Sequence, residues 1–241
     1  MSVSASQSPA SNESRPMIQH PVIAIDGPAG AGKSTVARAL ARRLGFFLLD
    51  TGAIYRSLAL FAQQQGVSWA DGPRLGALAE TLPIRFGRGE EDGAVFLADQ
   101  TVTTAIRTPE VSLGASQVSA HPEVRAMLLG LQRHLSRSGP CVVEGRDIGT
   151  VVLPDAPLKI FLTASPEVRA ERRQKELEAR GVKADATATR REQEERDRRD
   201  LTRATAPLKC AEDAVLFDTS EHSIEQVIDE LVATAKQRLS L

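Results

Sequence analysis

The chain has 241 residues, of which 41% are hydrophobic, and this composition supports one sizeable core with room for a small inserted lobe. Its formal net charge of −1 excludes a general electrostatic affinity for nucleic acid or for acidic membranes. No apolar run approaches the roughly 18 residues that span a bilayer, and residues 1–20 hold no apolar export segment, so we expect a cytoplasmic protein without a membrane partner.

Residues 1–20 are rich in serine and have almost no large apolar side chains. Ordering such a segment would cost conformational entropy with little burial in return, so we expect a disordered tail. Cys141 and Cys210 lie far apart and belong to no C-x-x-C pair, and we interpret both as structural. The four histidines are dispersed without a motif and receive no catalytic role.

An apolar run at residues 22–25 predicts a buried strand, and the segment after it fits the pattern G-x-x-x-x-G-K-[ST]. Together with the next threonine, its residues are Gly27, Pro28, Ala29, Gly30, Ala31, Gly32, Lys33, Ser34 and Thr35. The glycines let the backbone curl so that amide N–H groups face one concave spot, and a helix that starts near Lys33 adds its positive dipole. The sequence therefore predicts a P-loop for a nucleotide polyphosphate, in which Lys33 reaches the β and γ phosphates and Ser34 ligates Mg²⁺.

The segments after this loop alternate between helix and strand. Residues 33–44 place apolar side chains four apart on one helix face, and a glycine follows where a left-handed cap would end the helix. Residues 46–50 predict a second buried strand. A further helix begins at Thr51, with Tyr55 and Arg56 projecting from its first turns.

The pattern changes between about residues 72 and 108, where a short helix precedes three short strand-like runs. These runs are residues 84–86, 94–97 and 101–103. Turn residues between the first two runs favour a small antiparallel insertion. Pro109 and Pro122 then start two helices that we expect to end near residues 120 and 139.

Apolar strands recur at residues 141–143, 158–162 and 215–217, each separated from the next by a helical pattern. Strands that are apolar throughout and alternate with helices indicate an α/β fold with a parallel sheet covered on both faces. Polar clusters follow two of the strands, at residues 50–56 and 144–150. Ligands bind beyond the carboxyl ends of parallel strands, so we expect these clusters and the P-loop to converge on one crevice.

The segment from residue 166 to residue 203 is the most charged part of the chain. Its cationic residues are Arg169, Arg172, Arg173, Lys175, Arg180, Lys183, Arg190, Arg191, Arg196, Arg198, Arg199 and Arg203. We expect most of them to lie on two solvent-exposed helices and to form i,i+4 ion pairs with the acidic residues between them. The alternative is a lid whose arginines close over phosphates, with Arg196 and Arg203 two helical turns apart on the same face.

Taken together, these segments resemble the bacterial cytidylate kinases, within the nucleoside monophosphate kinases. The similarity runs from about residue 22 to residue 239. It rests on residues 25–28 leading into the P-loop and on residues 49–56, 106–111, 115–119, 122–125, 145–152 and 203–208. It implies a kinase domain at residues 21–241 of the P-loop NTPase type, with a five-stranded parallel sheet, a monophosphate-binding insertion at about 72–108 and an Arg-rich lid at about 166–200.

The resemblance also implies transfer of the γ-phosphoryl group of ATP to CMP or dCMP, with Mg²⁺ as the cofactor. By matching motif, Thr51, Tyr55 and Arg56 would hold the acceptor nucleotide. Ser116, Arg125 and Asp147 would read cytosine. Arg146, Arg196 and Arg203 would grip phosphates and, with Lys33, serve catalysis, while Asp200 would contact the sugar.

Other functions of a P-loop protein or of an arginine-rich segment can be compared with the residues that this chain has. A GTPase switch needs an Asn-Lys-x-Asp motif to read guanine, and the only asparagine, Asn12, lies in the tail. A nucleic-acid binding module could use the arginine-rich segment, but interleaved acidic residues cancel its field. A kinase for another small acceptor, such as a different monophosphate or a metabolite alcohol, stays open. We expect a monomer, because the lobes of such a kinase must move.

Overall fold

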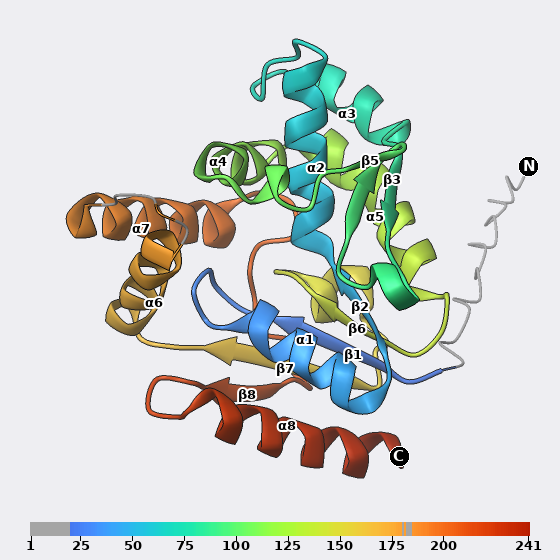
Figure 1. Ribbon diagram of the computed structural model, residues 1–241, viewed down its shortest axis with the longest axis vertical. Coiled ribbons are helices and arrows are strands. Elements are labelled where there is room, and N and C mark those ends of the chain that lie inside the picture. The colour runs from blue at the N-terminus through green and yellow to red at the C-terminus, as the bar shows by residue number, and fades with distance from the viewer. Residues whose placement is uncertain (1–19, 180, 182–184) are drawn as a thin grey trace, which may run out of the picture.

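The computed structural model describes residues 20–179, 181 and 185–241. Within these residues, five parallel strands form the central sheet in the order β2-β6-β1-β7-β8 (Figure 1). The strands are β1 (Val22–Asp26), β2 (Phe47–Asp50), β6 (Cys141–Glu144), β7 (Leu158–Thr163) and β8 (Val215–Asp218). The expected α/β fold with a parallel five-stranded sheet is therefore confirmed. The tail expected at residues 1–20 lies, apart from residue 20, outside the described residues.

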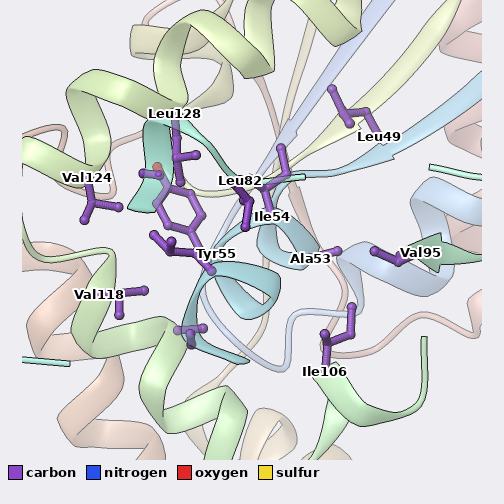
Figure 2. Close-up of a cluster of buried hydrophobic side chains, with 14 of the residues drawn as sticks. Leu49, Ala53, Ile54, Tyr55, Leu82, Val95, Ile106, Val118, Val124 and Leu128 are labelled. Atoms are coloured by element: carbon purple, nitrogen blue, oxygen red, sulfur yellow. The ribbon is translucent and has the colours of Figure 1, made fainter. Parts of the chain in front are cut away.

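Helices cover both faces of this sheet. Alternate residues of β1 separate the two sides, with Ile23 and Ile25 in one apolar cluster and Val22 and Ala24 in the other. The first cluster includes residues of α1 (Lys33–Leu44) and α8 (Ile224–Leu239). The second, shown in part in Figure 2, includes residues of α2 (Thr51–Gln64), α3 (Gly72–Glu80), α4 (Pro109–Val118) and α5 (Pro122–Ser136).

The ends of these helices follow local signals. Gly45 takes the expected left-handed conformation, with φ 69°, and ends α1. The Asp50 side chain accepts a hydrogen bond from the backbone N–H of Ala53 and so caps α2. Helices α4 and α5 end two and three residues earlier than expected. Both helices end because their last turns tighten: the Ala120 N–H donates to the Gln117 carbonyl, and the Ser138 N–H donates to the Leu135 carbonyl, three residues back instead of four.

The insertion is a three-stranded antiparallel sheet within the described residues. Its strands are β3 (Ile84–Phe86), β4 (Val95–Leu97) and β5 (Gln100–Thr101), and short 3₁₀ turns lie at Gly89–Glu91 and Ala105–Arg107. The third strand is shorter than the run 101–103 and starts earlier. A tight turn at Ala98, with φ 49°, pairs Gln100 with Leu97, while Val102 turns into the core.

Two long charged helices, α6 (Pro166–Ala179) and α7 (Ala186–Thr202), connect β7 to the last part of the chain. In Figure 1 they lie together beyond one end of the central strands. Within the described residues, no helix is long and apolar enough to cross a membrane. The two cysteines are free, and burial raises the pKa of the Cys141 thiol to about 12, which makes it unreactive.

Candidate active site

The loop between β1 and α1 has the backbone of a phosphate cradle. Gly27 has φ 145°, and a Cβ at this position would lie 2.0 Å from the carbonyl oxygen of Leu162, so only glycine fits. Gly30 and Gly32 are left-handed, with φ 77° and 85°. Among the described residues, no side chain caps the N-terminus of α1. The first N–H groups of the helix and its positive dipole are therefore available to an anion.

Lys33 and Ser34 stand at the mouth of this cradle. Lys33 is 6% exposed, and its Nζ donates a hydrogen bond to the carbonyl of Pro28 at 2.7 Å. Burial lowers the pKa of Lys33, and the charge of the nearby Arg146 lowers it further. The Ser34 hydroxyl donates to the buried Glu144 carboxylate at 2.9 Å. Pro28, Ala29 and Gly30 are half-buried, Ala31 is fully buried, and Thr35 is exposed on the first turn of α1.

Glu144 is a site residue that the sequence analysis did not single out. It ends β6, beside β1 in the sheet, so its side chain meets the start of α1. Burial raises the pKa of Glu144 to about 7, and the Asp50 charge also raises it. The Thr51 hydroxyl donates to the Glu144 carbonyl at 2.7 Å, which ties the segment after β2 to the segment after β6. The expected convergence of these clusters at one sheet edge is therefore confirmed.

Tyr55 lies in a different place from the one expected. It is 8% exposed and packs among apolar side chains, including Val124 and Leu128, instead of projecting from α2 (Figure 2). Its ring lies 5.6 Å from the guanidinium carbon of Arg125, a cation–π contact. Side chains of α5 enclose the Tyr55 ring on this side, so Tyr55 packs against the Arg125 guanidinium. Arg56 does project, and its Nη2 lies 2.6 Å from the Asp50 carboxylate.

Asp147 joins two arginines from distant elements. It is 4% exposed, and its carboxylate accepts hydrogen bonds from Arg125 of α5 and, at 3.2 Å, from Arg203. Ser116 of α4 is also buried, and its Oγ has no hydrogen-bond partner among the described residues. A buried hydroxyl without a partner is costly, and a polar ligand at this position would satisfy it.

A second cluster holds more positive than negative charge. Arg146 donates from Nε to the Asp200 carboxylate at 2.8 Å. Burial, together with the charge of Arg146, lowers the pKa of Arg196 to about 10. Both arginines also lower the pKa of Lys33, so the three cations lie close enough to repel one another. Such a cluster binds phosphate groups, because a polyanion relieves that repulsion.

Arg203 lies at the C-terminal end of helix α7, two turns beyond Arg196. Helix α7 ends at Thr202 and Arg203 is its C-cap, with φ −60° and its N–H donating to the Arg199 carbonyl, while ψ 140° turns the following chain out of the helix. The two side chains converge on Asp200. The Nη1 of Arg203 lies 4.0 Å from its carboxylate, and the Arg196 charge helps to lower the Asp200 pKa against the effect of burial.

The outer faces of α6 and α7 carry the exposed ion pairs that the charge pattern predicts, such as Lys175 with Glu171 and Arg190 with Glu194. Their inner faces contact the P-loop. Arg169 donates to the Ala29 carbonyl at 3.1 Å, and the Gln193 amide donates to the same oxygen at 3.2 Å. Arg180 and Lys183, which belong to the same charged segment, lie outside the described residues.

Asp26 is another buried carboxylate that sequence reasoning missed. It ends β1 and is 4% exposed, and its two oxygens accept the backbone N–H groups of Ile148 at 2.8 Å and Gly149 at 2.7 Å. Burial raises the Asp26 pKa to about 6, although the two hydrogen bonds act in the opposite direction. The Asp147 charge raises this pKa and the Lys33 charge lowers it.

The pH dependence of the free energy of unfolding should reveal the ionisation of Asp26. The folded pKa of about 6 exceeds the ordinary value of 3.8, so the folded state holds the proton more tightly than the unfolded chain. The Asp26 contribution to the free energy of unfolding is therefore fully present below pH 4 and is lost as the pH rises through about 6, a change of about 3 kcal/mol. Urea titrations of wild type and Asp26→Asn from pH 4 to pH 8 isolate it, because other groups cancel in the difference. A constant difference across this range would contradict the assignment.

Comparisons with known proteins agree with this geometry. Residues 23–237 match the cytidylate kinase family. A cytidylate kinase from Pelotomaculum thermopropionicum is 52% identical over 218 residues, which cover 90% of this chain and 96% of that protein. One from Exiguobacterium sibiricum is 49% identical over 217 residues, which cover 90% of this chain and 97% of that protein.

Among solved structures, an uncharacterized protein from Eubacterium ventriosum is similar in fold, with a TM-score of 0.52. It covers 91% of this chain and 100% of its own length at 12% identity, a likeness that concerns the fold alone. The family assignment rests instead on the match at residues 23–237 and on the identity of these relatives over nearly their whole length. On these grounds the chain belongs to the cytidylate kinase family.

Proposed function

We propose that the crevice at the carboxyl edge of the sheet transfers the γ-phosphoryl group of ATP to CMP and dCMP, giving CDP and dCDP. The observation that carries this proposal is the cluster of Lys33, Arg146 and Arg196, in which the charges of both arginines lower the pKa of Lys33 and the charge of Arg146 lowers the pKa of Arg196. It lies between the P-loop and the Asp147 carboxylate, where the phosphates of a donor and an acceptor would meet. The enzyme is accordingly a phosphotransferase of small-molecule nucleotides.

The donor side is the P-loop. The N–H groups of Gly27, of residues 29–32 and of the start of α1 would surround the ATP phosphates, with Lys33 on the β and γ phosphates. Mg²⁺ would bind at the Ser34 hydroxyl, where the Glu144 carboxylate 2.9 Å away supplies a second hard oxygen of the kind that this ion prefers. When bound, Mg²⁺ would neutralise negative charge on the ATP phosphates.

The acceptor side lies across the cation cluster. Asp147, Arg125 and Ser116 would read cytosine, and the unpartnered Ser116 hydroxyl supports this role. Arg56 would hold the acceptor nucleotide directly, whereas the buried Thr51 and Tyr55 would act by fixing Glu144 and Arg125. The phosphates would be gripped by Arg146, Arg196 and Arg203, and Asp200 would contact the sugar.

The chemistry needs few special groups. A monophosphate acceptor already presents a nucleophilic oxygen, so the transfer requires no strong general base. Alignment of the two substrates and neutralisation of the phosphate charge would accelerate it. We infer the domain organisation on the same grounds: residues 21–241 form one kinase domain, the insertion at about 72–108 belongs to the acceptor side, and α6 and α7 form a lid. We further propose that the enzyme is a cytoplasmic monomer.

A panel of acceptors tests the proposal directly. Purified protein is incubated with ATP, Mg²⁺ and CMP, dCMP, UMP, AMP or a small metabolite alcohol, and ADP formation is followed. We expect the highest kcat/KM with CMP and dCMP. A higher value with another monophosphate or with an alcohol would overturn the assignment of the acceptor and favour the other kinase class.

The proposed role of Arg203 predicts the effect of a conservative change. Arg203 donates from Nε to the Ala206 carbonyl at 2.6 Å and from Nη2 to Asp147 at 3.2 Å. Lysine keeps the charge but loses the planar fork, so Arg203→Lys should lower kcat about tenfold or more. Steady-state kinetics measure this, with Arg198→Lys as the control because Arg198 is exposed and pairs only with the nearby Glu195 in the described structure. Wild-type kinetics for Arg203→Lys would indicate that Arg203 does not grip a phosphate and serves only as a structural partner of Asp147.

A further inference from the structure

Asp26 connects the P-loop to the opposite side of the crevice. Strands β1 and β6 stay paired up to Ile25 and Glu144, and the Gly145 N–H then donates to the Ile25 carbonyl at 2.9 Å. Beyond this point the chain after β6 leaves the sheet. The Asp26 carboxylate provides the next contact, by accepting the N–H groups of Ile148 and Gly149.

The segment that Asp26 holds is an unusual turn. Residues Ile148–Val152 form a π-helical turn in which the N–H groups of Val151 and Val152 both donate to the Asp147 carbonyl. The first N–H groups of such a turn have no partner within it. Asp26 supplies that partner from another strand, and π turns are rare features that recur at functional sites. The conformation of Asp147, with φ −145° and ψ 27°, is the start of this turn.

The turn determines where two site residues point. Asp147 immediately precedes it and binds Arg125 and Arg203, and Arg146 before it binds Asp200. On the donor side, Asp26 directly precedes Gly27, whose backbone leaves no room for a Cβ against Leu162. One carboxylate thus joins a rigid point of the donor cradle to the backbone that aims the acceptor residues.

A carboxylate is the side chain that this geometry requires. Both of its oxygens accept hydrogen bonds, so it serves two parallel N–H donors at once. An asparagine of the same size has one accepting oxygen, and its NH₂ group would face the second N–H. Burying a carboxylate is costly, and the raised pKa of Asp26 reflects that cost.

We propose that Asp26 is a positioning residue for the acceptor nucleotide, because its carboxylate holds the Ile148–Val152 turn and so aims Asp147 and Arg146 at CMP. This inference rests on the proposed function. It assigns Asp26 no contact with either substrate. It predicts that disturbing Asp26 weakens CMP recognition much more than ATP binding, although Asp26 is adjacent in sequence to the ATP loop.

Steady-state kinetics of Asp26→Asn test this, with each substrate varied at saturating concentration of the other. We expect the KM for CMP to rise about tenfold or more, the KM for ATP to change less than about threefold, and the preference for CMP over UMP to fall. A lower folded fraction would instead reduce kcat alone. A folded variant with an unchanged KM for CMP, or with equal increases in both KM values, would overturn the proposal.

Two further variants complete the test. Asp26→Glu keeps both accepting oxygens but lengthens the side chain by one methylene, so it displaces the same turn if Asp26→Asn does not fold. We expect it to raise the KM for CMP about threefold and to leave the KM for ATP unchanged, and an unchanged KM for CMP would count against Asp26. Asp213→Asn removes the exposed partner of Lys159 and should match wild type. If wild type itself does not phosphorylate CMP, the proposed function fails, independently of Asp26.

Discussion

Replacing Lys33 by methionine should lower kcat by roughly a hundredfold or more while leaving the fold intact. Methionine has a similar length, but it removes the charge that would stabilise the transferring phosphoryl group, and one preorganised contact of this kind contributes about 3 to 4 kcal/mol. The fold should tolerate the change because Lys33 makes one side-chain hydrogen bond in the described structure, to Pro28, and its burial is already unfavourable for the charged form.

The measurement is kcat for CMP with ATP, together with circular dichroism to confirm folding. Lys175→Met is the matched control, because Lys175 lies on the outer face of α6 and pairs with Glu171, with both side chains exposed. We expect this control to keep wild-type turnover. Near-normal kcat in Lys33→Met would exclude the proposed role in neutralising phosphate charge.

Most of the fold could be predicted because its signals are local. The helix Lys33–Leu44 begins and ends where the sequence predicts, and the helix Thr51–Gln64 begins where it predicts, since Gly45 and Asp50 cap them through contacts within a few residues. The convergence of the P-loop with the segments after β2 and β6 could also be predicted. Parallel strands bring their carboxyl ends to one edge whatever their order.

Long-range contacts could not be predicted in the same way. The Asp26 carboxylate binds backbone groups more than 120 positions away, and in the sequence it is only a polar residue at the end of an apolar run. Helical periodicity predicted the direction of Tyr55 incorrectly, because side chains of α5, such as Val124 and Leu128, bury this ring.

The choice of base should depend on which atoms of the ring edge donate and which accept. Cytosine offers an N4 amino donor beside an N3 acceptor, and uracil reverses both. Both Asp147 oxygens already accept from arginines, but each keeps a second lone-pair direction for an amino group. Each reversed contact costs about 1 to 3 kcal/mol, so kcat/KM for UMP should be lower than for CMP by roughly ten- to several-hundredfold.

Asp147→Asn should lower kcat/KM for CMP about a hundredfold and should also narrow this preference. The first effect follows because Arg125 and Arg203 lose their shared anionic partner in a buried site, where an unpaired charge is costly. The second follows because an amide can turn its NH₂ group towards the O4 atom of uracil. The two effects separate when kcat/KM is measured for CMP and UMP on both proteins. A large loss with an unchanged ratio would mean that Asp147 orients the two arginines and that other groups, such as Ser116, read the base.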